Sequence, residues 1–194
     1  MSGHPLGDRA VRIDRPVGVD AGSIAHAVLA EPGVIDVVVT EEHVGVYFAG
    51  APPEAAAIAS LRARLAGVAV SSEKREVVIA VRYDGADLAA AAATLGLDVD
   101  ALVALHLGRV YEVKMMGFLP GFAYLGDVDR RLELPRRAEP RRSVPAQSVA
   151  IAGTYTAIYP YASPGGWHLL GTAPAFRPLD IELGDVVRFT RASS

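Results

Sequence analysis

The sequence predicts an α+β protein with two domains: an N-terminal unit of strands and helices, followed by a C-terminal β-barrel or sandwich. The chain has 194 residues, of which 51% are hydrophobic and 21% charged, the composition of an ordinary globular protein of one or two domains. Apolar strand patterns alternate with two helical patterns over residues 11–71. After Met116, prolines and glycines recur between short apolar segments, which favours strands joined by turns.

The N-terminal domain is predicted to have the order β-α-β-β-α-β, which is the ferredoxin-like split βαβ pattern. The first helix ends at Pro32-Gly33, because proline cannot continue a helix and glycine suits the turn beyond it. A junction without apolar residues at 71–74 divides the chain into domains 1–73 and 74–194. The six elements are a strand at 11–13, a helix at 23–30, strands at 34–40 and 44–48, a helix at 53–66 and a strand at 68–71.

The C-terminal domain begins with a predicted strand at 77–81. Two short helices follow, and each opens with an aspartate, Asp87 or Asp98, whose carboxylate can cap free backbone N–H groups. Each helix ends near a glycine, Gly96 or Gly108. The remaining predicted elements are helices over 87–95 and 98–107 and strands over 110–115, 148–152, 167–170 and 186–190.

Composition excludes several functional classes. The chain has no cysteine, so it forms neither disulfides nor thiolate metal sites, and we expect a cytoplasmic protein. Residues 1–12 lack the apolar core of a signal peptide, and no apolar run is long enough for a membrane helix. The net charge of −3 gives no general attraction to nucleic acid. His4, His26 and His43 lack metal-ligand spacing, and the surroundings of Lys114 differ from those of a biotin attachment site.

Three rigid segments between Met116 and Gly171 carry the functional prediction. Residues 117–125 place three aromatic side chains between glycines and prolines, and residues 158–168 form a second aromatic turn. Between them, residues 135–145 display four arginines in a segment that prolines hold extended, which suits recognition of carboxylates or phosphates. We expect the three segments to line one cleft.

These segments resemble the KipI-like family, which includes the B subunit of 5-oxoprolinase and proteins named allophanate hydrolase subunit 1. The resemblance is strong from Val77 to Phe189. The matching motifs, in order, are Gly117-Phe-x-Pro-Gly-Phe-Ala-Tyr-Leu125, Pro135-Arg-Arg-x-x-Pro-Arg141, Val144-Pro145, Ser148-Val-Ala-Ile151, Tyr159-Pro160, Ser163-Pro-Gly-Gly-Trp167 and Gly171.

The resemblance implies a cyclophilin-like antiparallel β-barrel for the C-terminal domain. It also implies a carboxyltransferase-domain subunit that works with a larger KipA-like partner, known as the C subunit of 5-oxoprolinase or allophanate hydrolase subunit 2. Such a pair is similar to the carboxyltransferase half of urea carboxylase and, with a third component, opens the ring of 5-oxoproline with ATP. The expected activity is therefore hydrolysis of a carbon–nitrogen bond in a small cyclic amide, which the chain performs only within the complex.

The resemblance and the residue types together nominate the site. We predict catalytic roles for His106, Arg136 and Arg141. A structural histidine, a solvated arginine loop and aromatic core packing are the alternatives for these side chains and the rings. The residues predicted to contact the substrate or the partner are Phe118, Pro120, Phe122, Tyr124, Ser148, Tyr159, Gly165, Gly166, Trp167 and His168.

The chain departs from the family pattern at three positions. Gln147 and Ala157 stand where the family commonly has glycine, and Thr172 stands where it commonly has arginine. Two other functions are alternatives. The family's namesake inhibits a sensor histidine kinase, which suggests a regulatory binding protein. The barrel fold also suggests a prolyl isomerase, although the Phe-His-Arg signature of cyclophilins is absent.

Overall fold

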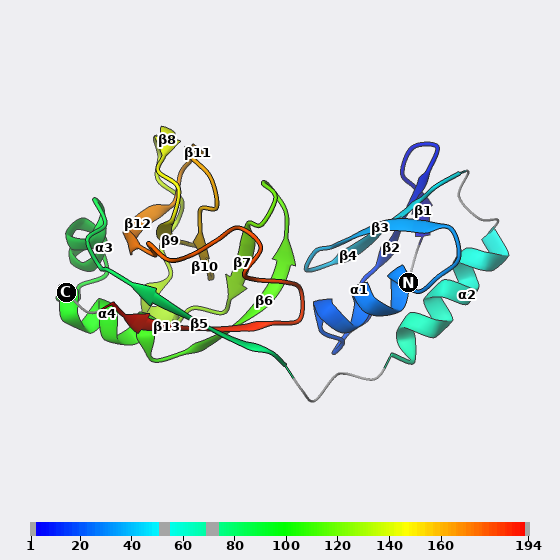
Figure 1. Cartoon of the computed structure of the whole chain (residues 1–194), viewed down its shortest axis with the longest axis horizontal. Coiled ribbons are helices and arrows are strands. Elements are labelled where there is room, and N and C mark those ends of the chain that lie inside the picture. The colour runs from blue at the N-terminus through cyan, green and yellow to red at the C-terminus, as the bar shows by residue number, and fades with distance from the viewer. Residues whose placement is uncertain (1–2, 51–54, 69–73, 193–194) are drawn as a thin grey trace.

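The structure is a computed structural model that describes residues 3–50, 55–68 and 74–192. Its elements form two lobes (Figure 1). One lobe holds the N-terminal sheet with two helices, and the other holds a barrel-like sheet with two short helices at its far end.

The N-terminal sheet has the strand order β1-β2-β4-β3. The antiparallel pairs β2/β4 and β4/β3 leave β2 and β3 parallel with β4 between them, as in a split βαβ unit. The predicted last strand, 68–71, falls largely outside the described residues. The place beside β2 is taken instead by β1, which pairs with it through a turn at Gly7 (φ 72°), so the described order is ββαββα. The elements are β1 (Gly3–Pro5), β2 (Ala10–Asp14), α1 (Ala21–Leu29), β3 (Val34–Val39), β4 (His43–Phe48) and α2 (Ala55–Ala66).

Helix α1 begins where Asp20 caps it. The Asp20 carboxylate accepts hydrogen bonds from the Ser23 backbone N–H at 2.9 Å and from the Ser23 hydroxyl at 2.7 Å. Burial opposes ionisation of Asp20, but these hydrogen bonds and the charge of Lys74 hold its pKa below the usual value. One face of α1 then packs on the sheet through Ile24 and Val28, which are fully buried.

The C-terminal lobe is built on a seven-stranded sheet with the order β12-β9-β10-β7-β6-β13-β5. Neighbouring strands are antiparallel except β13 and β5, which run parallel, so the expectation of an entirely antiparallel barrel is corrected at this pair. The elements are β5 (Glu76–Val81), α3 (Leu88–Thr94), α4 (Val99–Leu107), β6 (Val110–Met116), β7 (Ala123–Gly126), the 3-10 turn η1 (Arg130–Leu132), β8 (Arg141–Val144), β9 (Ser148–Ala152), β10 (Tyr155–Ile158), β11 (Ser163–Gly165), β12 (His168–Thr172) and β13 (Val186–Arg191).

The two edges of this sheet meet beyond β5. Arg82 and Thr172 exchange backbone hydrogen bonds of 2.8 Å, and Gly85 N–H donates to Leu170 at 3.1 Å. A Cβ at Gly85 would lie 2.3 Å from the Leu169 carbonyl oxygen, and one at Gly171 would lie 2.1 Å from that of Arg82. The barrel closes here because neither position carries a side chain.

Strand β9 is buried on both faces, which explains the second hydrophobic layer of this lobe. Val149 and Ile151 point into the barrel, whereas Ala150 and Ala152 contact a separate cluster of aromatic side chains on its outer surface. The small side chains on this outer face leave room for the rings above them.

The two lobes touch through backbone as well as side chains. A Cβ at Gly22 in α1 would lie 2.5 Å from the Cα of Gly184, which itself has φ 94°. Next to it, Leu183 packs against the hydrophobic core of the N-terminal lobe. We call Gly22, Leu183 and Gly184 the glycine seam.

Within the described ranges, no single helix has the length and apolar composition needed to cross a membrane. Helices α3 and α4 reach that length and composition only together, and their axes are bent by 94°.

Candidate functional site

The three segments predicted to form one cleft do meet around a small pocket of about 100 Å³. We call it the aromatic pocket. It lies against the aromatic cluster on the outer surface of the barrel. Its lining residues are Phe118, Phe122, Tyr124, Arg136, Tyr159, Pro164, Gly165, Gly166 and Trp167.

Phe122 stands at the centre of the pocket wall. Its ring lies edge-to-face with those of Phe118 and Tyr159 at centroid distances of 5.4 Å, and with that of Trp167 at 5.7 Å. Such T-shaped contacts favour one fixed arrangement of the rings. Trp167 is 5% exposed and Phe118 is 58% exposed, so the wall is rigid at its base and open at its rim.

The rim is held in an unusual backbone conformation. Phe118 has φ 72°, in the left-handed region that non-glycine residues rarely occupy. Gly121 follows with φ 77°, and a Cβ there would lie 2.0 Å from the Pro178 carbonyl oxygen. The loop between β6 and β7 is therefore pressed against residue 178, and this contact presents the Phe118 ring to solvent. Positive φ at a bulky exposed residue is typical of functional loops.

The four arginines divide between two environments. Arg136 is exposed and lines the aromatic pocket. Arg137 and Arg141 instead donate to one carboxylate oxygen of Asp87, at 2.9 and 2.7 Å. The other Asp87 oxygen accepts the Leu169 backbone N–H at 2.8 Å. We call this group of four residues the Asp87 clamp.

The clamp carries one carboxylate for two guanidinium groups. Burial opposes ionisation of Asp87, but the hydrogen bonds from Arg141 and Leu169 and both positive charges hold its pKa below the usual value. Arg137 Nε and Arg141 Nη1 are buried without a hydrogen-bond partner in the described part of the chain. The clamp thus leaves one excess positive charge beside the pocket wall.

The sequence predicted another role for Asp87. The side chain of Asp98 caps its helix by accepting the Ala101 N–H at 2.7 Å, as predicted. Asp87 makes no such hydrogen bond to α3, because the arginines and Leu169 occupy its oxygens. The prediction of a capping Asp87 is therefore wrong. A short polar residue before a helix carries no signal for partners 50 residues away in sequence.

His106 lies inside the barrel and does not line the pocket. It is fully buried, it stacks on Phe189 at 4.7 Å, and its ring nitrogens contact the hydroxyls of Tyr83 at 2.7 Å and Thr156 at 2.8 Å. Because the Thr156 hydroxyl donates to the Ala150 carbonyl at 3.1 Å, it accepts from His106 Nε2, and Nδ1 accepts from Tyr83. Burial lowers the pKa of His106 to about 3, so the ring is neutral. This is the environment of a structural histidine.

The remaining predicted site residues lie around the pocket. Ser148 is buried at the start of β9, and Pro120 is exposed in the β6–β7 loop without lining the pocket. His168 lies next to the carbonyl of Pro135, with its Nε2 at 2.9 Å from that oxygen, so it ties β12 to the arginine segment.

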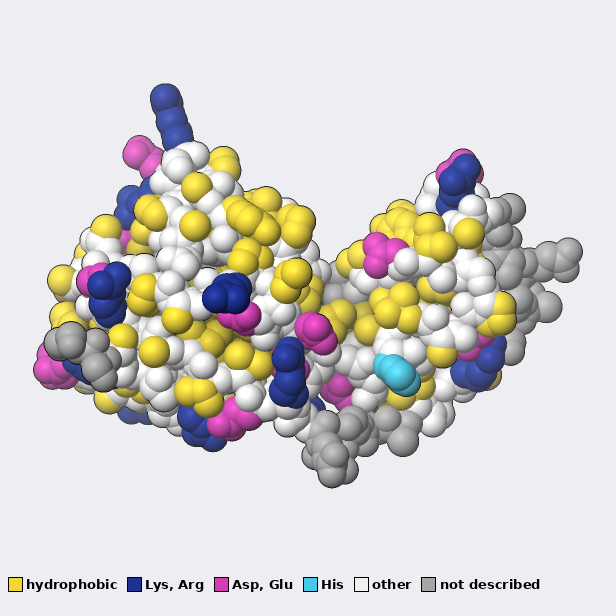
Figure 2. Space-filling model, in the orientation of Figure 1, with side chains coloured by type: hydrophobic (Ala, Val, Ile, Leu, Met, Phe, Trp, Pro, Cys, Tyr) yellow, Lys and Arg dark blue, Asp and Glu magenta, His cyan; other side chains and the backbone are white. Residues whose placement is uncertain are grey.

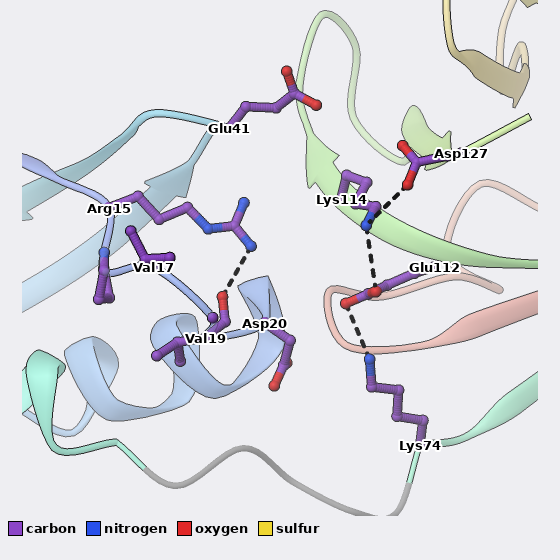
Figure 3. A pocket seen from close by; sticks show the side chains of 11 residues that line it. Arg15, Val17, Val19, Asp20, Glu41, Lys74, Glu112, Lys114 and Asp127 are labelled. Carbon is purple, nitrogen blue, oxygen red and sulfur yellow. Dashed lines mark hydrogen bonds and ion pairs between the residues drawn. The ribbon is translucent and has the colours of Figure 1, made fainter.

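A larger hollow of about 640 Å³ lies between the lobes (Figure 3), and we call it the interdomain cleft. The β2–α1 loop and Glu41 form its N-terminal wall, while β6, Asp127 and Lys74 form the opposite wall. Figure 2 shows acidic and basic side chains gathered beside the notch between the lobes. Arg15, Lys74 and Lys114 face Asp20, Glu41, Glu112 and Asp127 across it.

No sequence motif indicated this cleft. Its charged residues come from segments scattered over more than a hundred positions, and none belongs to the motif segments between Met116 and Gly171 except Asp127. Only the packing of the two lobes brings them together. Lys114, considered above only as a biotin site, lies in an ion-pair network with Glu112 and Asp127.

The aromatic pocket can bind, but it offers little chemistry of its own. The described residues that line it include one guanidinium and two phenols, with no carboxylate or imidazole. Burial raises the pKa of the Tyr159 phenol, so this hydroxyl stays protonated near neutral pH. In the described ranges no group of His, Asp and Glu side chains is placed to hold a metal ion. The arrangement suits recognition of a flat or carboxylate-bearing group.

Fold and site define a two-domain protein whose nearly closed β-barrel carries a binding pocket on its outer surface. Residues 2–180 match the family model described as carboxyltransferase domain, subdomain C and D, and the chain belongs to this family. Within it, the chain belongs to the KipI-like group of 5-oxoprolinase B subunits that the motifs indicated.

Three relatives illustrate the similarity. The 5-oxoprolinase B subunit of Escherichia coli O157:H7 is 47% identical over 131 residues, which are 62% of this chain and 60% of that protein. The Bacillus subtilis (strain 168) protein of the same name is 41% identical over 142 residues, 67% of this chain and 59% of that protein. The crystal structure of TTHA0988 matches 96% of this chain and 40% of its own, with a TM-score of 0.79 and 37% identity. The matches thus span about 60% of the length of these curated relatives.

Proposed function

We propose that this chain is the small subunit of a heteromeric, ATP-dependent amidohydrolase of the 5-oxoprolinase type. Its aromatic pocket forms part of the surface where a larger KipA-like subunit and a small cyclic amide meet. The observation that carries the proposal is the convergence of the family's scattered motif residues on one pocket. The names of the relatives support the oxoprolinase assignment.

The roles of the pocket residues follow from their positions. Phe118 and Trp167 provide an exposed and a buried aromatic surface, and Arg136 offers a guanidinium fork at the rim. The Asp87 clamp fixes the segment that carries Arg136, since Arg137 N–H also donates to the Gly166 carbonyl at 2.8 Å. Groups that transfer protons would come from the partner, because the described pocket lining lacks a side chain suited to that task at neutral pH.

No feature of the fold or the site favours the two alternatives, a kinase inhibitor or a prolyl isomerase. Of the three side chains predicted to be catalytic, Arg136 is the one that lines the pocket. Arg141 acts through the Asp87 clamp, and His106 supports the barrel from within.

The test uses the chain copurified with its large partner and supplied with the third component. We expect 5-oxoproline-dependent ATP hydrolysis, and we expect Phe118→Ala to reduce it or the amount of copurified partner at least about tenfold, as removal of a central interface aromatic does. Phe118 suits the test because it is 58% exposed. Trp167→Ala would also remove about 3–5 kcal/mol of stability.

The matched control is Tyr161→Ala. Tyr161 is 49% exposed and lies in the turn after Tyr159, but it does not line the pocket. Equal effects of the two variants would remove the pocket from the proposal. A complete complex that leaves both 5-oxoproline and ATP unchanged would overturn the assigned activity.

A further inference from the structure

The interdomain cleft contains a network of ion pairs that is incompletely compensated. Lys74 Nζ lies 3.0 Å from Glu112. Lys114 Nζ lies 3.5 Å from Glu112 and 3.6 Å from Asp127, which is too long for strong hydrogen bonds. Four carboxylates face three cations in this lining. The C-terminal wall is therefore under-neutralised at Asp127, whose side chain is 64% exposed.

Arg15 on the opposite wall has the converse property. Its guanidinium donates to the Thr40 carbonyl at 2.9 Å and the Val19 carbonyl at 3.1 Å. Both acceptors are neutral, and in the described part of the chain no carboxylate forms an ion pair with Arg15. A guanidinium has five N–H donors, so most of its hydrogen-bonding capacity remains for another group. The half-buried Arg15 is a fixed positive charge without a counter-ion.

Figure 3 shows how these groups lie. Arg15 reaches from the N-terminal wall toward Lys114 on the other wall, while Glu41 and Asp127 stand at the same end of the cleft. Glu41 is in turn held by the Tyr155 hydroxyl, which donates to its carboxylate. One end of the cleft thus presents acidic groups, and Arg15 and Lys114 border the space next to it.

The frame around these charges is rigid. The two hydrogen bonds of Arg15 tie the β2–α1 loop to the end of β3, and the Arg15 backbone N–H donates to Glu42 at 2.8 Å. The glycine seam fixes the lobes on one side of the cleft and the Tyr155–Glu41 contact fixes them on the other. A preorganised charge binds a ligand with less loss of side-chain entropy than a mobile one.

We propose that the interdomain cleft binds a small zwitterionic ligand that carries a carboxylate and an ammonium group. The carboxylate is bound by Arg15, with Lys114 nearby, and the ammonium is bound by Asp127 and Glu41. The volume of about 640 Å³ accommodates a small molecule. Val17, which is fully exposed in the cleft lining, provides an apolar contact for a short aliphatic segment. This site is separate from the aromatic pocket and does not depend on its function.

The experiment is an NMR titration of the full chain labelled with ¹⁵N. The probes are glycine, β-alanine and 4-aminobutyrate, which separate the two charges by increasing lengths, with propionate and propylamine as single-charge controls. We expect at least one zwitterion to shift the Arg15 side-chain N–H resonance and the backbone amides of the cleft. It should bind at least about tenfold more tightly than propionate, because it adds a second charge-assisted hydrogen bond.

Three variants locate the site. Arg15→Gln should abolish the shifts, whereas Arg12→Gln, which changes an exposed arginine three positions away on β2, should leave them intact. Asp127→Asn should reduce the affinity for the zwitterion to that for propionate without changing propionate binding. Because Asp127 is largely exposed, this variant decides the question even if Arg15→Gln does not fold.

Three outcomes would overturn the proposal. The first is an absence of shifts with every zwitterion at millimolar concentration. The second is equal affinity for propionate and the best zwitterion, which would make the cleft a plain anion site. The third is an Asp127→Asn protein that binds the zwitterion as well as the original chain does.

Discussion

The aromatic pocket and the interdomain cleft differ in how their residues are held. The pocket is small, belongs to one lobe, and is built from rings that are also part of a hydrophobic cluster. The cleft is larger, uses both lobes, and is lined by charged side chains that are at least partly exposed, apart from the capping Asp20. Changes near the pocket should therefore act through folding stability, whereas changes at the cleft should act on charge and on the position of the lobes.

The largest effect is expected from Asp87→Asn at the Asp87 clamp. The change removes the charge that Arg137 and Arg141 share, and it leaves two partly buried guanidinium groups facing each other. We expect a loss of about 2–3 kcal/mol in the free energy of unfolding, measured by urea denaturation. Asp84→Asn is the control, because Asp84 is half exposed and accepts only a hydroxyl hydrogen bond from Thr172 together with a loose contact to Arg82. Equal losses in both variants would contradict the clamp.

A pH-dependent effect of similar size should arise beneath the pocket, at His106. Its pKa is about 3 in the folded protein and about 6.5 in the unfolded chain, so the unfolded chain binds the proton first as the pH falls. The stabilisation is complete above pH 6.5 and is lost progressively down to pH 3. Between pH 7 and pH 5 the free energy of unfolding should fall by about 2 kcal/mol.

Urea denaturation at several pH values measures this slope. His106→Gln retains a donor and an acceptor for Thr156 and Tyr83 but does not titrate. We expect the variant to lose most of the slope between pH 7 and pH 5, whatever its stability at neutral pH. An unchanged slope would show that other groups cause the acid sensitivity.

The contrast between the two hollows also shows what the sequence could predict. The helices and most strands followed from apolar patterns and from glycine and proline, and the pocket followed from motif residues that lie close together in the chain. The cleft did not, because Arg15 and Lys114 are 99 positions apart and meet only through the glycine seam. His106 was misplaced in function for a related reason. Its sequence neighbours do not reveal that Thr156 and Tyr83 satisfy it inside the barrel.

At the cleft, Gly22→Ala tests the seam. A methyl group there meets the Gly184 backbone at 2.5 Å, so the lobes must shift, and we expect a loss of about 1–2 kcal/mol despite the higher helix propensity of alanine. Amide resonances of residues 15–20 should move while those around Trp167 stay unchanged. Gly50→Ala, where no atom lies within 4 Å of the added group, is the control. Shifts that spread evenly over both lobes would mean that the seam does not set the cleft.

The smallest expected effect concerns Gln147, the departure from the family pattern that touches the pocket's support. Gln147 has φ 66°, which explains why glycine is common there, and its backbone N–H donates to the Tyr159 carbonyl at 2.6 Å. Its side chain donates to the carbonyls of Pro174 at 3.0 Å and Phe176 at 3.2 Å. Relief of the backbone strain in Gln147→Gly, about 1 kcal/mol, should nearly offset the loss of two partly exposed hydrogen bonds.

Gln147→Ala separates the two contributions, because it keeps the strained backbone and removes the hydrogen bonds. We expect its unfolding free energy to fall below that of Gln147→Gly by about 1 kcal/mol. If both variants lose the same amount, the side-chain hydrogen bonds alone matter. The left-handed conformation would then contribute nothing to the preference for glycine at this position, and the aromatic pocket would tolerate the departure without compensation from Pro174 and Phe176.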